Sequence, residues 1–158
     1  MPQSVPEPQF DELYRELLLD HYRSPRHSEA LADPDVVAEG YNPLCGDEVE
    51  LGLQFENGVV SDLSVRGRGC SISQASGSML TDAVIGKPVA EVRRLVDLFT
   101  AMVTDPEVEP AAELGDLEAL QGVAKFPVRV KCATLSWHTL VDGLDQREAG
   151  GDAVRHEE

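Results

Sequence analysis

The strongest constraint on the fold of this chain is a two-residue turn, Asn57-Gly58, between two stretches of alternating side chains. Over residues 48–55 apolar side chains alternate with polar or small ones, and a second apolar-rich stretch covers 59–65. Asn-Gly readily takes the positive φ angles of a tight hairpin turn. The pattern predicts an antiparallel β-hairpin in which residues 59–65 form one bent strand or two short ones.

Most of the remaining chain has helical periodicity. Apolar residues recur at three- and four-residue steps over 10–22, 72–84 and 89–103, and again over 133–144 after Pro127, and a short helix is expected within 114–123. Cys70 then lies at a strand-to-helix junction and Cys132 in the first turn of the last helix. A hairpin followed by helices favours an α+β fold, with a small antiparallel three-stranded sheet covered on one face by helices.

The length of 158 residues suits a single domain. We expect a mobile N-terminal tail over 1–9, the domain over 10–144 and a polar C-terminal tail over 145–158. Residues 26–47 are rich in proline, aspartate, asparagine and glycine, which predicts a loop that contains Cys45.

The charge of the chain limits its partners. Thirteen lysines and arginines stand against 29 aspartates and glutamates, a net charge of −16. Such a surface repels phosphate backbones and anionic lipids, so neither nucleic acid nor a membrane surface is an expected partner. The longest aliphatic run, Leu17–Leu19, is far too short to span a bilayer, and no export signal is recognisable. We therefore expect a cytoplasmic protein.

Three cysteines are too few for a disulfide framework, and in a reducing compartment they are available for metal or sulfur chemistry. In Cys45-Gly46-Asp47 the glycine lets the backbone turn so that a sulfur and a carboxylate oxygen face one point. With Cys70 and Cys132 this makes four ligands, the number that a tetrahedral zinc ion requires. Without CxxC pairs, three unrelated core cysteines remain an open alternative.

Other interpretations fit the sequence less well. A Cys-His hydrolase is disfavoured because His138 lies on the wrong side of a helix to face Cys132, and His21 borders an apolar stripe where a structural role is expected. Four cations stand near Cys70 and Cys132. They either protect a strand edge and a helix end, or stabilise thiolate and persulfide anions, or dock an acidic partner. These cations are Arg66, Arg68, Arg129 and Lys131.

Four segments together resemble the IscU/SufU family of iron-sulfur cluster assembly proteins, over residues 10–144. They are 20–27 (DHYRSPRH), 42–47 (NPLCGD), 69–76 (GCSISQAS) and 126–135 (FPVRVKCATL). Within the family the chain is similar to the SufU branch. Lys131 stands where IscU-type scaffolds carry a histidine, residues 126–130 lack the paired prolines of their chaperone-recognition motif, and the segment including 104–122 is like the SufU insertion.

The resemblance implies a role in iron-sulfur cluster biogenesis and one zinc ion per chain, bound by Cys45, Asp47, Cys70 and Cys132. It further implies a zinc-dependent sulfurtransferase, with Cys45 and Arg129 as catalytic residues. Cys45 would accept sulfur from a PLP-dependent, SufS-type cysteine desulfurase and pass it to downstream cluster assembly proteins. A histidine of the partner would take over one coordination position of the metal and so release Cys45. The PLP belongs to the partner. The alternative is a scaffold that assembles and transfers a labile iron-sulfur cluster on the same ligands.

Overall fold

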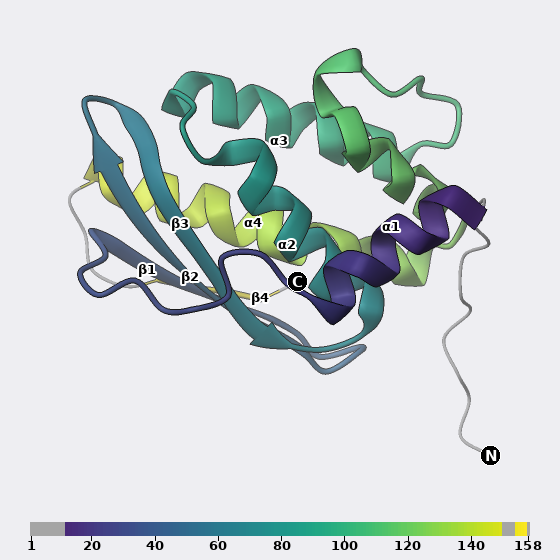
Figure 1. The fold of residues 1–158 in the computed structure, drawn as a ribbon, viewed down its shortest axis with the longest axis horizontal. Coiled ribbons are helices and arrows are strands. Elements are labelled where there is room, and N and C mark those ends of the chain that lie inside the picture. Colours follow the sequence, from purple (N-terminus) through teal and green to yellow (C-terminus); the bar gives the residue numbers. More distant parts are fainter. Residues whose placement is uncertain (1–11, 150–153, 158) are drawn as a thin grey trace.

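The computed structural model describes residues 12–149 and 154–157, and it has a twisted β-sheet with helices packed on one face (Figure 1). The fold is α+β, as the sequence predicts. The elements in chain order are α1 (Glu12–Arg23), β1 (Val36–Asn42), β2 (Asp47–Glu56), β3 (Val59–Arg68), α2 (Ser71–Val84), α3 (Val89–Thr104), the 3₁₀ segment η1 (Ala112–Lys125), α4 (Pro127–Ala149) and β4 (Val154–Glu157).

The sheet has the strand order β3-β2-β1-β4. Its first three strands are antiparallel, which confirms the predicted three-stranded core, and the short β4 adds to β1 in parallel. The third antiparallel strand is β1, however, within the segment predicted as a loop. Of the two alternatives for 59–65, the structure shows one strand, β3, and not two short ones. The register of its pairing with β2 shifts between Gln54 and Phe55. The turn between β2 and β3 has φ values of 54° at Asn57 and 77° at Gly58, as the hairpin requires.

The last helix is longer than the sequence suggests. It continues beyond residue 144 to Ala149, and in this extension Asp145 and Glu148 form ion pairs with Arg93 on α3 at 2.8 Å and 2.9 Å. Residues 154–157 then pair with β1, so much of the segment expected to be a polar tail belongs to regular elements. The predicted tail over 1–9 lies outside the described residues.

The helix α4 crosses the inner face of the sheet and fixes the core. Trp137 stacks on Phe99 of α3 with ring centroids 4.3 Å apart, and its indole N–H donates to the Ser76 hydroxyl at 3.0 Å. At Gly40 of β1 a Cβ atom would collide with the Thr139 hydroxyl, so this glycine permits the close approach of α4. Among the described residues no helix is both long and apolar enough to cross a membrane.

Candidate metal centre

Three of the four predicted ligands meet at one end of the sheet. Cys45 lies in the turn between β1 and β2, Asp47 begins β2, and Cys132 lies on α4. One ligand atom from each of these residues lies within 4.8 Å of the others, and the sulfurs of Cys45 and Cys132 are 3.1 Å apart with both thiols free. Because α4 begins at Pro127, Cys132 occupies its second turn, not the predicted first.

The turn that carries Cys45 is built by its neighbours. Gly46 has a φ of 71° and its N–H donates to the carbonyl of Asn42 at 2.9 Å. The Asn42 side-chain oxygen accepts the N–H of Leu44 at 3.2 Å. The glycine therefore provides the sharp turn that the sequence predicts, and Asn42 holds that turn from both its main chain and its side chain.

Asp47 is fully buried, and both of its carboxylate oxygens have defined partners. Oδ1 accepts the backbone N–H of Cys70 at 2.9 Å, and Oδ2 accepts the Asn42 amide at 3.3 Å. A Cβ atom on Gly69 would collide with Oδ1, so only glycine fits beside this carboxylate. Within residues 12–149 and 154–157 no lysine or arginine forms an ion pair with Asp47. A buried carboxylate without a cation is costly, which suits a metal ligand.

Cys70 borders the other three ligands and caps α2. Its sulfur accepts the N–H of Ser73 at 3.4 Å, and its own backbone N–H donates to Oδ1 of Asp47 at 2.9 Å. The hydrogen bond from Cys132, with help from the Ser73 N–H and the charge of Arg129, lowers the pKa of Cys70 to about 7 against the opposing effects of burial and Asp47. The same hydrogen bond and burial raise the pKa of Cys132. The two pKa shifts therefore favour Cys70 over Cys132 as a thiolate.

The four cations singled out in the sequence do not form one group. Arg129 is buried, with 7% of its surface exposed, and its charge acts on Cys70. Lys131 is exposed on the next turn of α4. Arg66 and Arg68 lie on β3 and pair with Glu50 at 3.6 Å and Glu48 at 3.0 Å. Of the four, Arg129 is the cation whose charge helps to lower the pKa of Cys70.

Histidines play no part in the cluster within the described part of the chain. The cluster there consists of Cys45, Asp47 and Cys132, and neither His21 nor His138 joins it. His21 instead bonds through Nδ1 to the Ser78 hydroxyl at 2.7 Å and is 5% exposed, which agrees with the structural role expected for it.

Sequence reasoning did not identify Asn42 and Gly69 as part of the site. Asn42 precedes Pro43, which is typical of a turn, and nothing in that pattern indicates that its amide would reach Asp47. The Asn42 amide nitrogen also lies 3.8 Å from the sulfur of Cys132. Both residues act by positioning Asp47, and only the packed structure reveals this.

Fold and site together define a class of protein. Residues 13–133 match the family described as "NifU-like N terminal domain", so the chain belongs to this family, which contains the IscU and SufU proteins of iron-sulfur cluster assembly. The family resemblance of the four sequence segments is confirmed.

The individual relatives include both a sulfurtransferase and scaffold proteins. It is 44% identical over 140 residues to the zinc-dependent sulfurtransferase SufU of Bacillus subtilis, covering 89% of this chain and 95% of that protein. It is 43% identical over 132 residues to the scaffold protein IscU of Streptococcus pyogenes, with 84% and 82% covered. The structure of a SufU from Fervidobacterium islandicum superposes with a TM-score of 0.76 at 32% identity, covering 82% and 94% of the two chains.

Proposed function

We propose that this protein is a zinc-bound sulfur acceptor in iron-sulfur cluster biogenesis. It takes persulfide sulfur from a PLP-dependent, SufS-type cysteine desulfurase and passes it to downstream cluster assembly proteins in the cytoplasm. The observation that carries the proposal is the convergence of two thiols and a buried carboxylate, with the backbone N–H of the third cysteine, Cys70, donating to that carboxylate. The similarity to the B. subtilis sulfurtransferase supports it.

The donor set suits zinc. Tetrahedral zinc takes thiolate and carboxylate ligands at about 2.0–2.3 Å, so its ligand atoms lie about 3.3–3.8 Å from one another. Cys45, Asp47 and Cys132 have ligand atoms within 4.8 Å of one another, and Cys70 supplies the fourth donor in this proposal. Zinc, when bound, would hold the thiols as thiolates and compensate the buried negative charge.

Cys45 is the proposed nucleophile because its position is the least constrained. Cys132 is 1% exposed on a long helix and Cys70 caps another, whereas Cys45 is partly exposed in a turn with the exposed Leu44 beside it. Its thiolate would attack the outer sulfur of the partner's persulfide. The partner's S–S bond then breaks, its cysteine leaves as a thiolate, and a new S–S bond makes Cys45 a persulfide. Arg129 would stabilise the anions of the cluster from the side of Cys70.

The test is to follow both metal and sulfur in protein purified anaerobically. We expect about one zinc per chain, consistent with four donors around a single ion. After incubation with desulfurase, PLP and cysteine, without reductant, mass spectrometry should place the added sulfur on the Cys45 peptide. Cys45→Ser should abolish both the persulfide and the stimulation of the desulfurase.

Two variants of the same chemistry serve as controls. Cys70→Ser and Cys132→Ser should bind less zinc yet still accept sulfur on Cys45. Sulfur on Cys70 or Cys132 in the wild type, with Cys45→Ser still active, would make Cys45 a plain ligand. Full occupancy by iron with bridging sulfide, and little zinc, would favour the scaffold function instead.

A further inference from the structure

One stretch of the sheet edge is open. The first part of the outer edge of β3 is covered. There the N–H of Val60 donates to the carbonyl of Lys87 at 3.0 Å, and its carbonyl accepts the N–H of Gly86 at 2.8 Å. Further along, the N–H of Val65 donates to the carbonyl of His27 at 3.0 Å. On the other side of the sheet, β4 covers the edge of β1. The stretch of β3 after Val65 has no such cover among the described residues.

The backbone of Gly67 faces this open stretch. Hydrogen-bonding directions alternate along a strand of an antiparallel pair. Since the N–H of Val65 points outward to His27, the N–H and C=O of Gly67 point outward as well. Within the described part of the chain the backbone of Gly67 has no hydrogen-bond partner on that side. Such an edge is a template for another strand.

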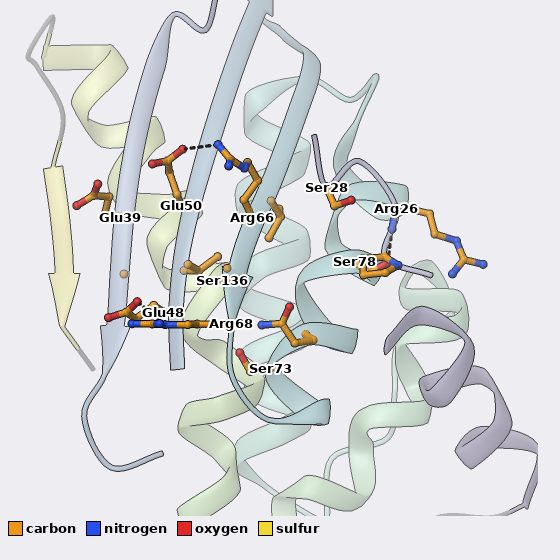
Figure 2. Close-up of a pocket in the computed structure, with 16 residues that line it drawn as sticks. Arg26, Ser28, Glu39, Glu48, Glu50, Arg66, Arg68, Ser73, Ser78 and Ser136 are labelled. Carbon is orange, nitrogen blue, oxygen red and sulfur yellow. Dashed lines mark hydrogen bonds and ion pairs between the residues drawn. The ribbon is translucent and has the colours of Figure 1, made fainter. Parts of the chain in front are cut away.

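A groove runs beside the open edge and gives an added strand room. It has a volume of about 610 Å³ and is lined by 65–68 of β3, by the segment after α1, by α2, by Ser136 of α4 and by parts of β1 and β2 that carry Glu39, Glu48 and Glu50. In Figure 2, Arg66 and Arg68 lie on one side of the groove, Arg26 and Ser28 lie on the other, and Ser73 is at its lower end. The groove walls are polar, and serine hydroxyls from α2 line them.

The edge carries positive charge in a strongly acidic protein. The side chains of Arg66 and Arg68 are 50% and 80% exposed, and each is paired on its inner side with a glutamate of β2. An added strand would place its own side chains on the outer side of these arginines. Opposite charges directly across neighbouring strands stabilise a sheet and like charges destabilise it. Two copies paired edge to edge through β3 would bring arginines together, so this arrangement is disfavoured.

We propose that residues 66–68 of β3 bind an extended, acidic segment of a partner protein as an additional strand. Its backbone pairs with Gly67, and acidic residues at alternate positions lie beside Arg66 and Arg68, extending each Glu-Arg pair into a three-residue charge ladder. This docking surface involves neither the metal ligands nor sulfur transfer. If the arginines served only to prevent edge-to-edge aggregation, no acidic strand would bind.

The experiment uses the metal-loaded, ¹⁵N-labelled full chain and two probe peptides, acetyl-TEVEVET-amide and its charge-reversed form acetyl-TKVKVKT-amide. Both are added to millimolar concentration, which suits short strands of weak affinity. The acidic peptide should slow hydrogen exchange of the Gly67 amide several-fold and shift its resonance, and the basic peptide should do neither. The double variant R66E/R68E should reverse this preference.

The control is Arg94→Glu, which breaks a similar exposed ion pair, with Glu113, on α3 and should behave as the wild type. Zinc content is measured for each variant, and Arg66→Glu alone replaces the double variant if the latter does not fold. Equal binding of the two peptides, no protection of Gly67 by either, an unchanged preference in the variant, or dimerisation of the chain through this edge would each overturn the proposal.

Discussion

Two buried polar clusters in this molecule are completed in different ways. Around His21 the groups are satisfied by each other: the Ser78 hydroxyl contacts Nδ1 of His21 at 2.7 Å and accepts the N–H of Arg26 at 2.9 Å. Around Asp47 the groups are a carboxylate and three thiols, and the donors on the carboxylate are a backbone N–H and one amide. The first cluster is neutral and closed, whereas the second gathers acidic groups.

This difference separates structural polarity from functional polarity. The hydrogen bonds of Ser78 join α2 to His21 of α1 and to Arg26 in the turn after α1. Because these groups satisfy one another, the network needs no ion or ligand from solution. An acidic cluster becomes favourable to fold when a cation compensates its charge. Burial alone would not have distinguished the two clusters, since His21 is 5% and Asp47 0% exposed.

The largest expected effect comes from removing the metal. A metal that binds only the folded state stabilises it by about 4 kcal/mol when its free concentration is about a thousand times Kd. For a chain of this size that corresponds to a fall in Tm of roughly 10 °C after chelation. Scanning calorimetry before and after verified metal removal measures the change, and restoring zinc should reverse it. An unchanged curve would show that the acidic cluster is stable without a cation.

A smaller effect is expected from Gly69→Ala, which places a methyl group against the carboxylate of Asp47. Displacing that carboxylate should weaken metal affinity about tenfold, as loss of ligand positioning does, and destabilise the protein by about 2 kcal/mol. Competition with a chromophoric chelator and thermal melts measure the two quantities.

The control for this prediction is Gly58→Ala in the hairpin turn, where φ is 77° and a Cβ atom would meet nothing within 4 Å. It carries the backbone strain without the collision. It should lose about 1 kcal/mol of stability and retain full metal affinity. Equal metal affinities of the two variants would show that Gly69 does not position the ligand.

The sequence predicts local structure well where one pattern dominates. Asn57-Gly58 fixed the hairpin, and the apolar spacing located α2 and α3. It missed β1 because Gly40 and the polar residues of 36–42 obscure the alternation, and the strand is defined only by pairing with β2. The last turns of α4 form ion pairs with Arg93, which are contacts distant in sequence that no local pattern predicts.

The same distinction between local patterns and contacts distant in sequence applies to the candidate site. Cys45-Gly46-Asp47 indicates two ligands from local geometry, and the fold brings Cys132 to them. Cys70 was expected beside them, and the structure places it as the N-cap of α2, with its N–H donating to Asp47. The contributions of Asn42 and Gly69 depend on contacts between β1, β2 and the start of α2, which no local pattern encodes.

The smallest expected effect tests the neutral cluster. Burial, followed by the charge of Arg26, lowers the pKa of His21 below its ordinary value of 6.5, although Asp82, Asp20 and Asp116 oppose the shift. The unfolded chain then binds a proton before the folded one, so stability is full above pH 6.5 and declines as pH falls through the folded pKa. His21→Gln should reduce this dependence on pH between about pH 7 and pH 5.5, because glutamine does not titrate there. Thermal melts at both pH values measure it, and His27→Asn, at an exposed histidine with a φ of 52°, is the control because asparagine tolerates that conformation. Metal release at low pH affects the wild type and both variants alike. An equal pH dependence of stability in all three would therefore show that His21 is not held neutral, and the contrast between the two clusters would fail.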